Sequence, residues 1–224
     1  MVDLLPFWIT FKLALITTAI LLVISLPVAN WLATGKGRFK SVIEALISMP
    51  LVLPPSVIGF YFLVAFGPTY GLGHFLEQYL NIRLVFSFPG LVLASIIYSL
   101  PFMIHPIQSG LVGLSPDIRE ASYLLGKSKL ETFFKVQLPN IKPALITGIV
   151  LTFAHTIGEF GVVLMIGGNI PNETRVVSIA IYDEVEALNY HTANIYAGIL
   201  FAITFVVLLT VNIVNKRYAI TRNL

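Results

Sequence analysis

Arg119-Glu120-Ala121-Ser122-Tyr123-Leu124-Leu125-Gly126 is a polar stretch in the middle of a chain that is otherwise almost entirely apolar. Polar sequence continues after it as far as Leu138-Pro139. Four basic residues lie in this segment: Arg119, Lys127, Lys129 and Lys135. A segment with this much charge cannot lie in the hydrocarbon of a lipid bilayer. It must therefore project into water on one side of a membrane, between apolar segments that stay in the bilayer.

The apolar residues of the polar stretch predict two short helices. They recur at intervals of three and four, at Ile118, Ala121, Leu124 and Leu125. This spacing is typical of an amphipathic helix, and Gly126 is a suitable residue to end it. A second helix is predicted at about residues 130–136 and carries Phe133 and Phe134. The pair would form a compact helix–turn–helix projection that offers apolar and charged groups to a partner outside the membrane.

The pattern Glu120-Ala121-Ser122, with Gly126 six residues after the glutamate, resembles the EAA loop of the permease subunits of ABC importers. Phe133, Val136 and the closing Leu138-Pro139 also fall at the family spacing, although Ser122 stands where the family has alanine. In that family the loop is a coupling helix that docks in a groove of a cytoplasmic ATPase subunit. The resemblance implies that Glu120 caps or pairs within the loop, that Gly126 permits the turn, and that Leu138-Pro139 starts the return into the bilayer.

The composition of the chain is that of an integral membrane protein. Of its 224 residues, 57% are hydrophobic and 11% are charged, and the mean hydropathy is +0.88. A soluble domain carries about 25% charged residues. The chain has no cysteine, which excludes disulfides, thiolate metal sites and a cysteine nucleophile. The net charge of +3 gives no argument for binding nucleic acid.

Five apolar spans are each near the ~20 residues that cross ~30 Å of hydrocarbon. They lie at about residues 13–33, 42–66, 89–111, 143–166 and 193–214. Pro50, Pro54 and Pro55 interrupt the second span and predict a broken helix, which survives in a membrane only where protein buries it or where it lines a cavity. We therefore expect an all-α integral membrane protein with a single permease domain over residues 1–224. Its third and fourth spans are joined by the polar loop 113–142, and the resemblance implies the type I fold of ABC importer permeases.

Most of the 14 basic residues fall on the side of the membrane that holds the polar loop. That side carries Lys36, Arg38, Lys40, Arg119, Lys127, Lys129, Lys135, Lys142, Lys216, Arg217 and Arg222. Basic residues mark the cytoplasmic side of a membrane protein. The prediction is a multi-pass protein of the cell (inner) membrane, with an external N-terminus and a cytoplasmic C-terminus. This argument from charge places the loop where an ATPase can reach it.

The sequence predicts neither a nucleotide site nor a metal site in this chain. Gly126-Lys127-Ser128 matches the end of a phosphate-binding loop, but such a loop needs a glycine five residues earlier, where this chain has Ala121. No histidines have the spacing of a metal site, and no catalytic arrangement is evident. We expect no catalytic residue and no cofactor in this chain, with ATP and Mg bound by a separate ATPase subunit.

Glu159 is an ionisable residue inside the predicted fourth span, flanked by Gly158, Phe160 and Gly161. Ionisable residues in spans usually face a cavity or a partner. Two interpretations carry about equal weight: a carboxylate that hydrogen-bonds to the backbone of a broken helix, or a gate residue that lines the pathway together with Pro50, Pro54 and Pro55. Gly158–Gly161, the stretch 169–175 and the break at 49–55 are similar to permeases for molybdate, tungstate and sulfate, and most of all to molybdate permease subunits.

No lysine or arginine lies within the five predicted spans. A tight site for a dianion needs fixed cations, helix N-termini or convergent donors. We therefore expect a conduit that binds its cargo weakly, with selectivity in an external oxyanion-binding protein that docks on the link 167–192. The resemblance implies a homodimer with the pathway at its two-fold axis, and two ATPase copies on residues near 118–134. Sulfate, thiosulfate and tungstate remain alternative cargoes, and a secondary anion carrier or a membrane-embedded enzyme remains an alternative class.

Overall fold

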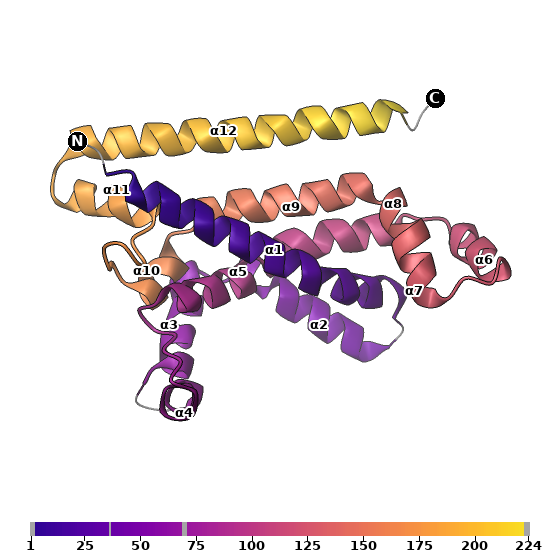
Figure 1. Ribbon diagram of the computed structural model, residues 1–224, viewed down its shortest axis with the longest axis horizontal. Coiled ribbons are helices and arrows are strands. Elements are labelled where there is room, and N and C mark those ends of the chain that lie inside the picture. The colour runs from indigo at the N-terminus through magenta and orange to yellow at the C-terminus, as the bar shows by residue number, and fades with distance from the viewer. Residues whose placement is uncertain (1–2, 36, 69–70, 222–224) are drawn as a thin grey trace.

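The computed structural model describes residues 3–35, 37–68 and 71–221, and this part of the chain contains helices and no strand (Figure 1). Lys36 and Arg222, which the charge argument used, lie outside the described residues. The elements are α1 (Leu5–Thr34), α2 (Arg38–Ser48), η1 (Met49–Leu51), α3 (Pro55–Phe66), α4 (Gly71–Leu80), α5 (Phe88–Val112), α6 (Pro116–Leu124), α7 (Lys129–Thr132), η2 (Phe133–Gln137), α8 (Leu138–Asn140), α9 (Lys142–Ile157), α10 (Gly161–Gly167), α11 (Val177–Glu186) and α12 (Tyr190–Thr221).

The long helices α1, α5 and α9 pack against one another, and α12 lies along α9 (Figure 1). Small residues allow α5 and α9 to approach closely, since a Cβ on Gly110 would lie 2.7 Å from the Cβ of Ala144. Two larger apolar clusters lie at opposite ends of the bundle, beside a smaller one around Phe7 and Tyr196. The cluster near the polar loop includes Leu21, Leu32, Ile104, Ile107 and Ile141, and the other includes Leu13, Leu91, Val163, Ile166 and Ile179.

In the described part of the chain, three helices are long and apolar enough to cross a membrane, namely residues 5–34, 88–112 and 190–210. They overlap the first, third and fifth predicted spans. Two bent helix pairs bring the number to as many as five. The first pair, α2–η1 with α3, bends by 110° at the prolines of the second predicted span. The second pair, residues 129–140 with α9, bends by 78°.

The fourth predicted span, residues 143–166, is not one helix in the structure. Helix α9 ends at Ile157, Gly158–Phe160 are non-helical, and α10 follows as a separate helix. The break is tolerated because the main-chain carbonyl of Glu159 accepts a hydrogen bond of 2.6 Å from Ser178 Oγ of α11. The links 67–87 and 167–192, expected as polar connections, also contain helices, α4 and α11.

The helices of the polar loop, α6 to α8, lie at one end of the bundle (Figure 1). The turn from α1 to α2 and the end of α12 lie at that same end, while the N-terminus, α10 and α11 lie at the other. The arrangement therefore separates a loop-bearing end from the end that carries α11, as a chain that passes repeatedly through a membrane requires.

Candidate functional site

Helix α6, the first helix of the polar loop, has a defined start and a defined end. Ser115 caps its N-terminus by accepting a hydrogen bond of 3.3 Å from the backbone N–H of Asp117, and Pro116 occupies the first turn. At its C-terminus, Gly126 has φ +76°, and its N–H donates to the carbonyl of Tyr123 at 2.9 Å. The N–H of Lys127 donates to the carbonyl of Ser122 at 3.2 Å. These two bonds form a Schellman motif, so the predicted helix end at Gly126 is correct.

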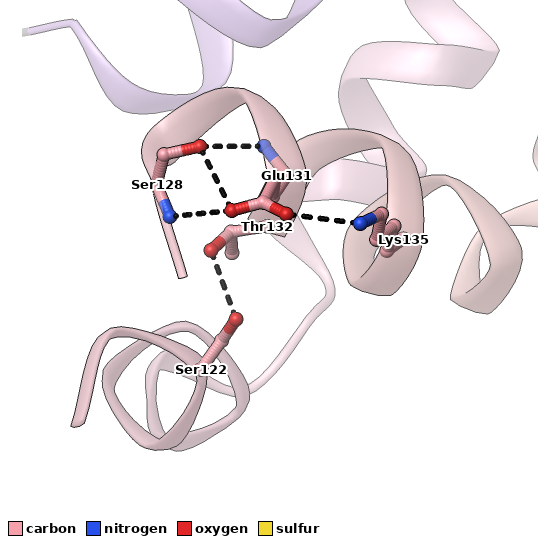
Figure 2. Close-up of polar contacts among 5 residues, drawn as sticks. All are labelled: Ser122, Ser128, Glu131, Thr132 and Lys135. Carbon is pink, nitrogen blue, oxygen red and sulfur yellow. Dashed lines mark hydrogen bonds and ion pairs between the residues drawn. The ribbon is translucent and has the colours of Figure 1, made fainter. Parts of the chain in front are cut away.

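A capping box starts α7, as Figure 2 shows. Ser128 Oγ accepts from the backbone N–H of Glu131 at 3.2 Å, and the Glu131 carboxylate accepts from the backbone N–H of Ser128 at 3.3 Å. Lys135 Nζ lies 2.9 Å from Glu131 Oε1 (Figure 2). The hydrogen bond from Lys135, followed by the backbone bond from Ser128, lowers the pKa of the Glu131 carboxyl below its ordinary value. The carboxylate is therefore ionised at neutral pH and holds the turn.

A buried hydrogen bond joins α6 to α7. Ser122 Oγ lies 2.8 Å from Thr132 Oγ1, and both side chains are buried (Figure 2). Ser122 therefore faces the inside of the loop, whereas its neighbours Glu120 and Ala121 are exposed. Within the described part of the chain Glu120 makes no hydrogen bond or ion pair, whereas Glu131 both caps α7 and pairs with Lys135. The sequence signal for Glu131 was available as Ser128-x-x-Glu131 and was missed.

The helix after α7 continues without interruption to Asn140. Residues 133–137 form a π-helical segment in which Phe133 is buried and Phe134 is exposed. Leu138 and Pro139 remain helical, so they do not start the return into the bilayer as predicted. The change of direction comes after α8, where the chain bends by 78° into α9, and Ile141 at the bend is buried.

Large apolar side chains are exposed on the polar loop although it is the most charged part of the chain. Leu124 is 88% exposed, Leu125 79% and Leu130 72%, and Phe134 is 58% exposed. We refer to these four residues as the apolar tip residues. A water-exposed loop does not retain such side chains for its own stability, and exposed apolar groups among polar ones are typical of a surface that binds another protein. Leu130 was not singled out from the sequence.

The two breaks in the spans meet at a second candidate site, a cavity of 530 Å³ that we call the break pocket. Pro55, Gly158, Glu159, Phe160 and Gly161 line it, as do Ser56, Tyr98, Ala154 and His155. A Cβ on Gly161 would lie 2.8 Å from the Cβ of Pro55, so the start of α10 touches the start of α3. Pro50 is buried in η1, and Pro54 precedes α3 as its N-cap; neither lines the pocket. Ser56 and Tyr98 were missed because nothing local distinguishes them.

Glu159 is 4% exposed and is held by side chains from two other helices. Ser95 Oγ of α5 donates to Glu159 Oε2 at 2.7 Å, while Ser178 of α11 donates to its main-chain carbonyl. Glu159 Oε1 has no hydrogen-bond partner in the described part of the chain. Ser99 Oγ similarly lies 2.9 Å from His155 Nδ1. The break pocket is thus lined by hydroxyl, imidazole and carboxyl groups with no lysine or arginine, which suits transient contact with a polar solute.

In the described residues, no group of three or more histidine, aspartate or glutamate side chains could hold a metal ion. The candidate sites are therefore a projecting loop for a partner and a polar pocket at the meeting point of two broken helices. Neither has the arrangement of a catalytic centre.

A family model, "Binding-protein-dependent transport system inner membrane component", matches residues 22–220. The chain belongs to this family. The permease is 46% identical over 207 residues, 92% of its own length and 91% of the relative's, to "Molybdenum transport system permease protein ModB" of Azotobacter vinelandii. It is 33% identical over 190 residues, 84% of its own length and 68% of the relative's, to "Sulfate transport system permease protein CysT" of Salmonella typhimurium.

A solved structure has the same fold as the permease. It is the "bacterial alginate ABC transporter in complex with alginate pentasaccharide-bound periplasmic protein", with a TM-score of 0.72, 14% identity, and coverage of 95% of the permease and 79% of that chain. The expected family and the type I ABC importer permease fold are therefore confirmed. The permease is a multi-pass protein of the inner membrane, and its family is one of transport proteins rather than enzymes.

Proposed function

We propose that this permease carries molybdate into the cytoplasm as part of an ATP-driven importer. An external binding protein delivers the oxyanion, and a separate ATPase subunit, which binds ATP and Mg, supplies the energy. The molybdenum transport relative supports this cargo, since it is similar along nearly the whole chain. The single structural observation that carries the mechanism is the rigid, capped polar loop with its apolar tip residues.

The ATPase docks on the polar loop. Burying the apolar tip residues in a groove contributes roughly 25 cal/mol for each Å² of apolar surface removed from water. Because the capping box, the Schellman motif and the Ser122–Thr132 bond fix the loop before contact, little conformational entropy is lost on docking. Movement of the ATPase is then passed to α9 through the continuous helical segment 129–140.

Two copies of the permease form the transporter, each with one ATPase copy, and the pathway lies between them along spans two to four. The break pocket provides polar contacts for the solute along this pathway. Its lack of cations lets the oxyanion pass without being trapped, since a conduit must release what it admits. Closure of the ATPases brings the two polar loops together and turns the inward-open dimer outward, where it accepts molybdate.

The first test uses the reconstituted permease with its co-encoded ATPase and binding protein. Stimulation of ATP hydrolysis by the molybdate-loaded binding protein alone would support molybdate as the cargo. Stimulation by the sulfate-loaded binding protein would support the same mechanism with sulfate as the cargo, an alternative suggested by the similarity to the sulfate permease. If no ATPase associates with the permease, the proposal fails and a secondary anion carrier takes its place.

The docking surface is tested with Leu124→Ser/Leu125→Ser. We expect this variant to lose the ATPase subunit during purification while staying in the membrane. Leu72→Ser is the matched control, because Leu72 is 62% exposed but lies on α4 outside the polar loop. Retention of the ATPase by the double variant, or its equal loss from the control, would contradict docking at the tip.

The orientation is tested by labelling single cysteines, since the natural chain has none. A membrane-impermeant maleimide applied to intact cells should label Leu72→Cys and leave Leu124→Cys unlabelled until the membrane is opened. The reverse pattern would place the polar loop outside and would exclude docking of a cytoplasmic ATPase.

A further inference from the structure

A polar hollow of 460 Å³ lies where the polar loop meets the end of α1, apart from both the apolar tip residues and the break pocket. Side chains from α1, α6, α7 and η2 line it, including Asn30, Thr34, Arg119, Glu120, Lys129 and Gln137. We call it the loop hollow. Transport as described above gives it no role.

Two cations from different helices converge on the loop hollow. Arg119 belongs to α6 and Lys129 to α7, and neither forms an ion pair within the described ranges. Of the four basic residues in the loop, Lys135 is paired with Glu131 at 2.9 Å, whereas Arg119, Lys127 and Lys129 form no ion pair within the described residues. Of these three, Arg119 and Lys129 line the hollow. Glu120 lines it as well and forms no ion pair with either cation within the described residues. Two cations at the wall of a concave site concentrate anions there.

Gln137 supplies a second, independent observation. Its side chain is 5% exposed and lines the hollow, and its Oε1 has no hydrogen-bond partner in the part of the chain that the structure describes. A buried acceptor without a donor is costly. Because an amide oxygen only accepts hydrogen bonds, a water ordered in the hollow by its occupant, or a hydroxyl of that occupant, would donate to it. Asn30 of α1 also lines the hollow.

We infer that the hollow lies near the membrane surface. Its wall includes the last turn of α1, a helix that is long and apolar enough to span the bilayer. Trp31 in that turn is 45% exposed, and tryptophan is enriched at the membrane–water interface. A group bound in the hollow is therefore accessible both from the lipid headgroup layer and from the aqueous phase.

We propose that the loop hollow binds a phosphate-type tetrahedral oxyanion through Arg119 and Lys129. The planar guanidinium of arginine matches two oxygens of such a group, and the ammonium of lysine adds a point charge. Such an oxyanion can come from two sources, which are the headgroup of an anionic phospholipid and a free oxyanion in water. The bound group connects α1 to the polar loop, so it adds a contact between the membrane domain and the docking surface. This binding does not depend on the cargo. Because Arg119 and Lys129 belong to the loop on which the proposed ATPase docks, it is tested on the permease alone.

The test is calorimetric titration of the purified permease in phosphate-free detergent with two probes, dihexanoylphosphatidylglycerol and inorganic phosphate. Arg119→Gln/Lys129→Gln should weaken binding of the responding probe by about tenfold or more. Lys127→Gln, a basic residue of the same loop outside the hollow, should leave the affinity unchanged. Glu120→Gln removes the opposing charge and should strengthen binding several-fold, a gain that misfolding cannot produce.

The titrations with the two probes distinguish a phospholipid headgroup from a free oxyanion. Binding of the lipid probe alone assigns the hollow to a phospholipid headgroup, while binding of inorganic phosphate with similar affinity assigns it to a free oxyanion. Absence of binding by both probes overturns the proposal. So does equal binding by the wild type and the Arg119→Gln/Lys129→Gln variant, or a loss of affinity in Lys127→Gln as large as in that variant.

Discussion

Replacing Gly126 should destabilise the end of α6 in the polar loop, and the backbone conformation at this residue sets the size of the free-energy change. Gly126 has φ +76°, a conformation that costs an L-residue about 1–2 kcal/mol. No heavy atom lies within 4 Å of a Cβ built at this position, so Gly126→Ala adds no steric clash and the whole cost is conformational. A change of 1–2 kcal/mol corresponds to a factor of roughly 5–30 in an opening equilibrium.

Gly126→Asn is the matched variant, because asparagine adopts the left-handed conformation more readily than alanine. Hydrogen exchange at the N–H groups of Gly126 and Lys127 reports the opening directly, since both donate the bonds that close α6. We expect exchange to accelerate by roughly 5–30-fold in Gly126→Ala and clearly less in Gly126→Asn. In the assembled transporter the same ranking should appear in ATPase affinity, because an open loop must be ordered again on docking. Equal exchange in both variants, or none faster than wild type, would refute the reasoning.

Three further predictions concern single interactions. Because the pKa of the Glu131 carboxyl is lowered, the carboxylate stabilises α7 fully at pH values above its ordinary pKa of 4.5 and progressively less as the pH falls below 4.5. Glu131→Gln should remove this pH dependence from amide exchange in α7, once the exchange rates are corrected for intrinsic rates. Gly161→Ala forces a Cβ within 2.8 Å of a proline and should cost about 1–3 kcal/mol and reduce uptake, whereas Gly198→Ala, with open space around it, should be neutral or stabilising in thermal unfolding. Ser95→Ala leaves a buried carboxylate oxygen without its donor and should destabilise by about 1–3 kcal/mol, while Ser25→Ala removes a buried hydroxyl that already lacks a partner and should be neutral or stabilising.

Local sequence predicted the polar loop well, because its structure depends on neighbours along the chain. Gly126 ends α6 through its own backbone freedom, and Leu124 and Leu125 are exposed because the charged loop projects beyond the spans. Glu131, which caps and pairs in the loop, was not predicted, although it lies three residues after Ser128, the spacing of a capping box. Within the described residues Glu120 has no such partner, and its predicted role remains a prediction.

Of the two helix breaks that form the break pocket, the sequence predicted only the one before α3. Prolines mark the bend before α3, because a proline removes a backbone donor wherever it stands. The break at Gly158–Phe160 has no proline, and the sequence on both sides of Glu159 is apolar, so hydropathy predicts one continuous span. It exists because Ser178, 19 residues further along, replaces the missing backbone donor to Glu159. A partner brought by the fold from another helix is not encoded in the local pattern.

The two sites are connected by the same packing that forms them. Ser122 and Thr132 tie α6 to the start of the helical segment 129–140, which reaches the bend at Ile141 without a break. Ile141 is buried in the core cluster that α1 and α5 form, and α9 beyond it is held closely against α5 at Gly110. We therefore expect a displacement of the apolar tip residues to move α9 relative to α5 rather than to be absorbed inside the loop. Helix α9 ends at Ile157, next to Gly158 on the wall of the break pocket, so one helix connects the bend after the loop to the pocket.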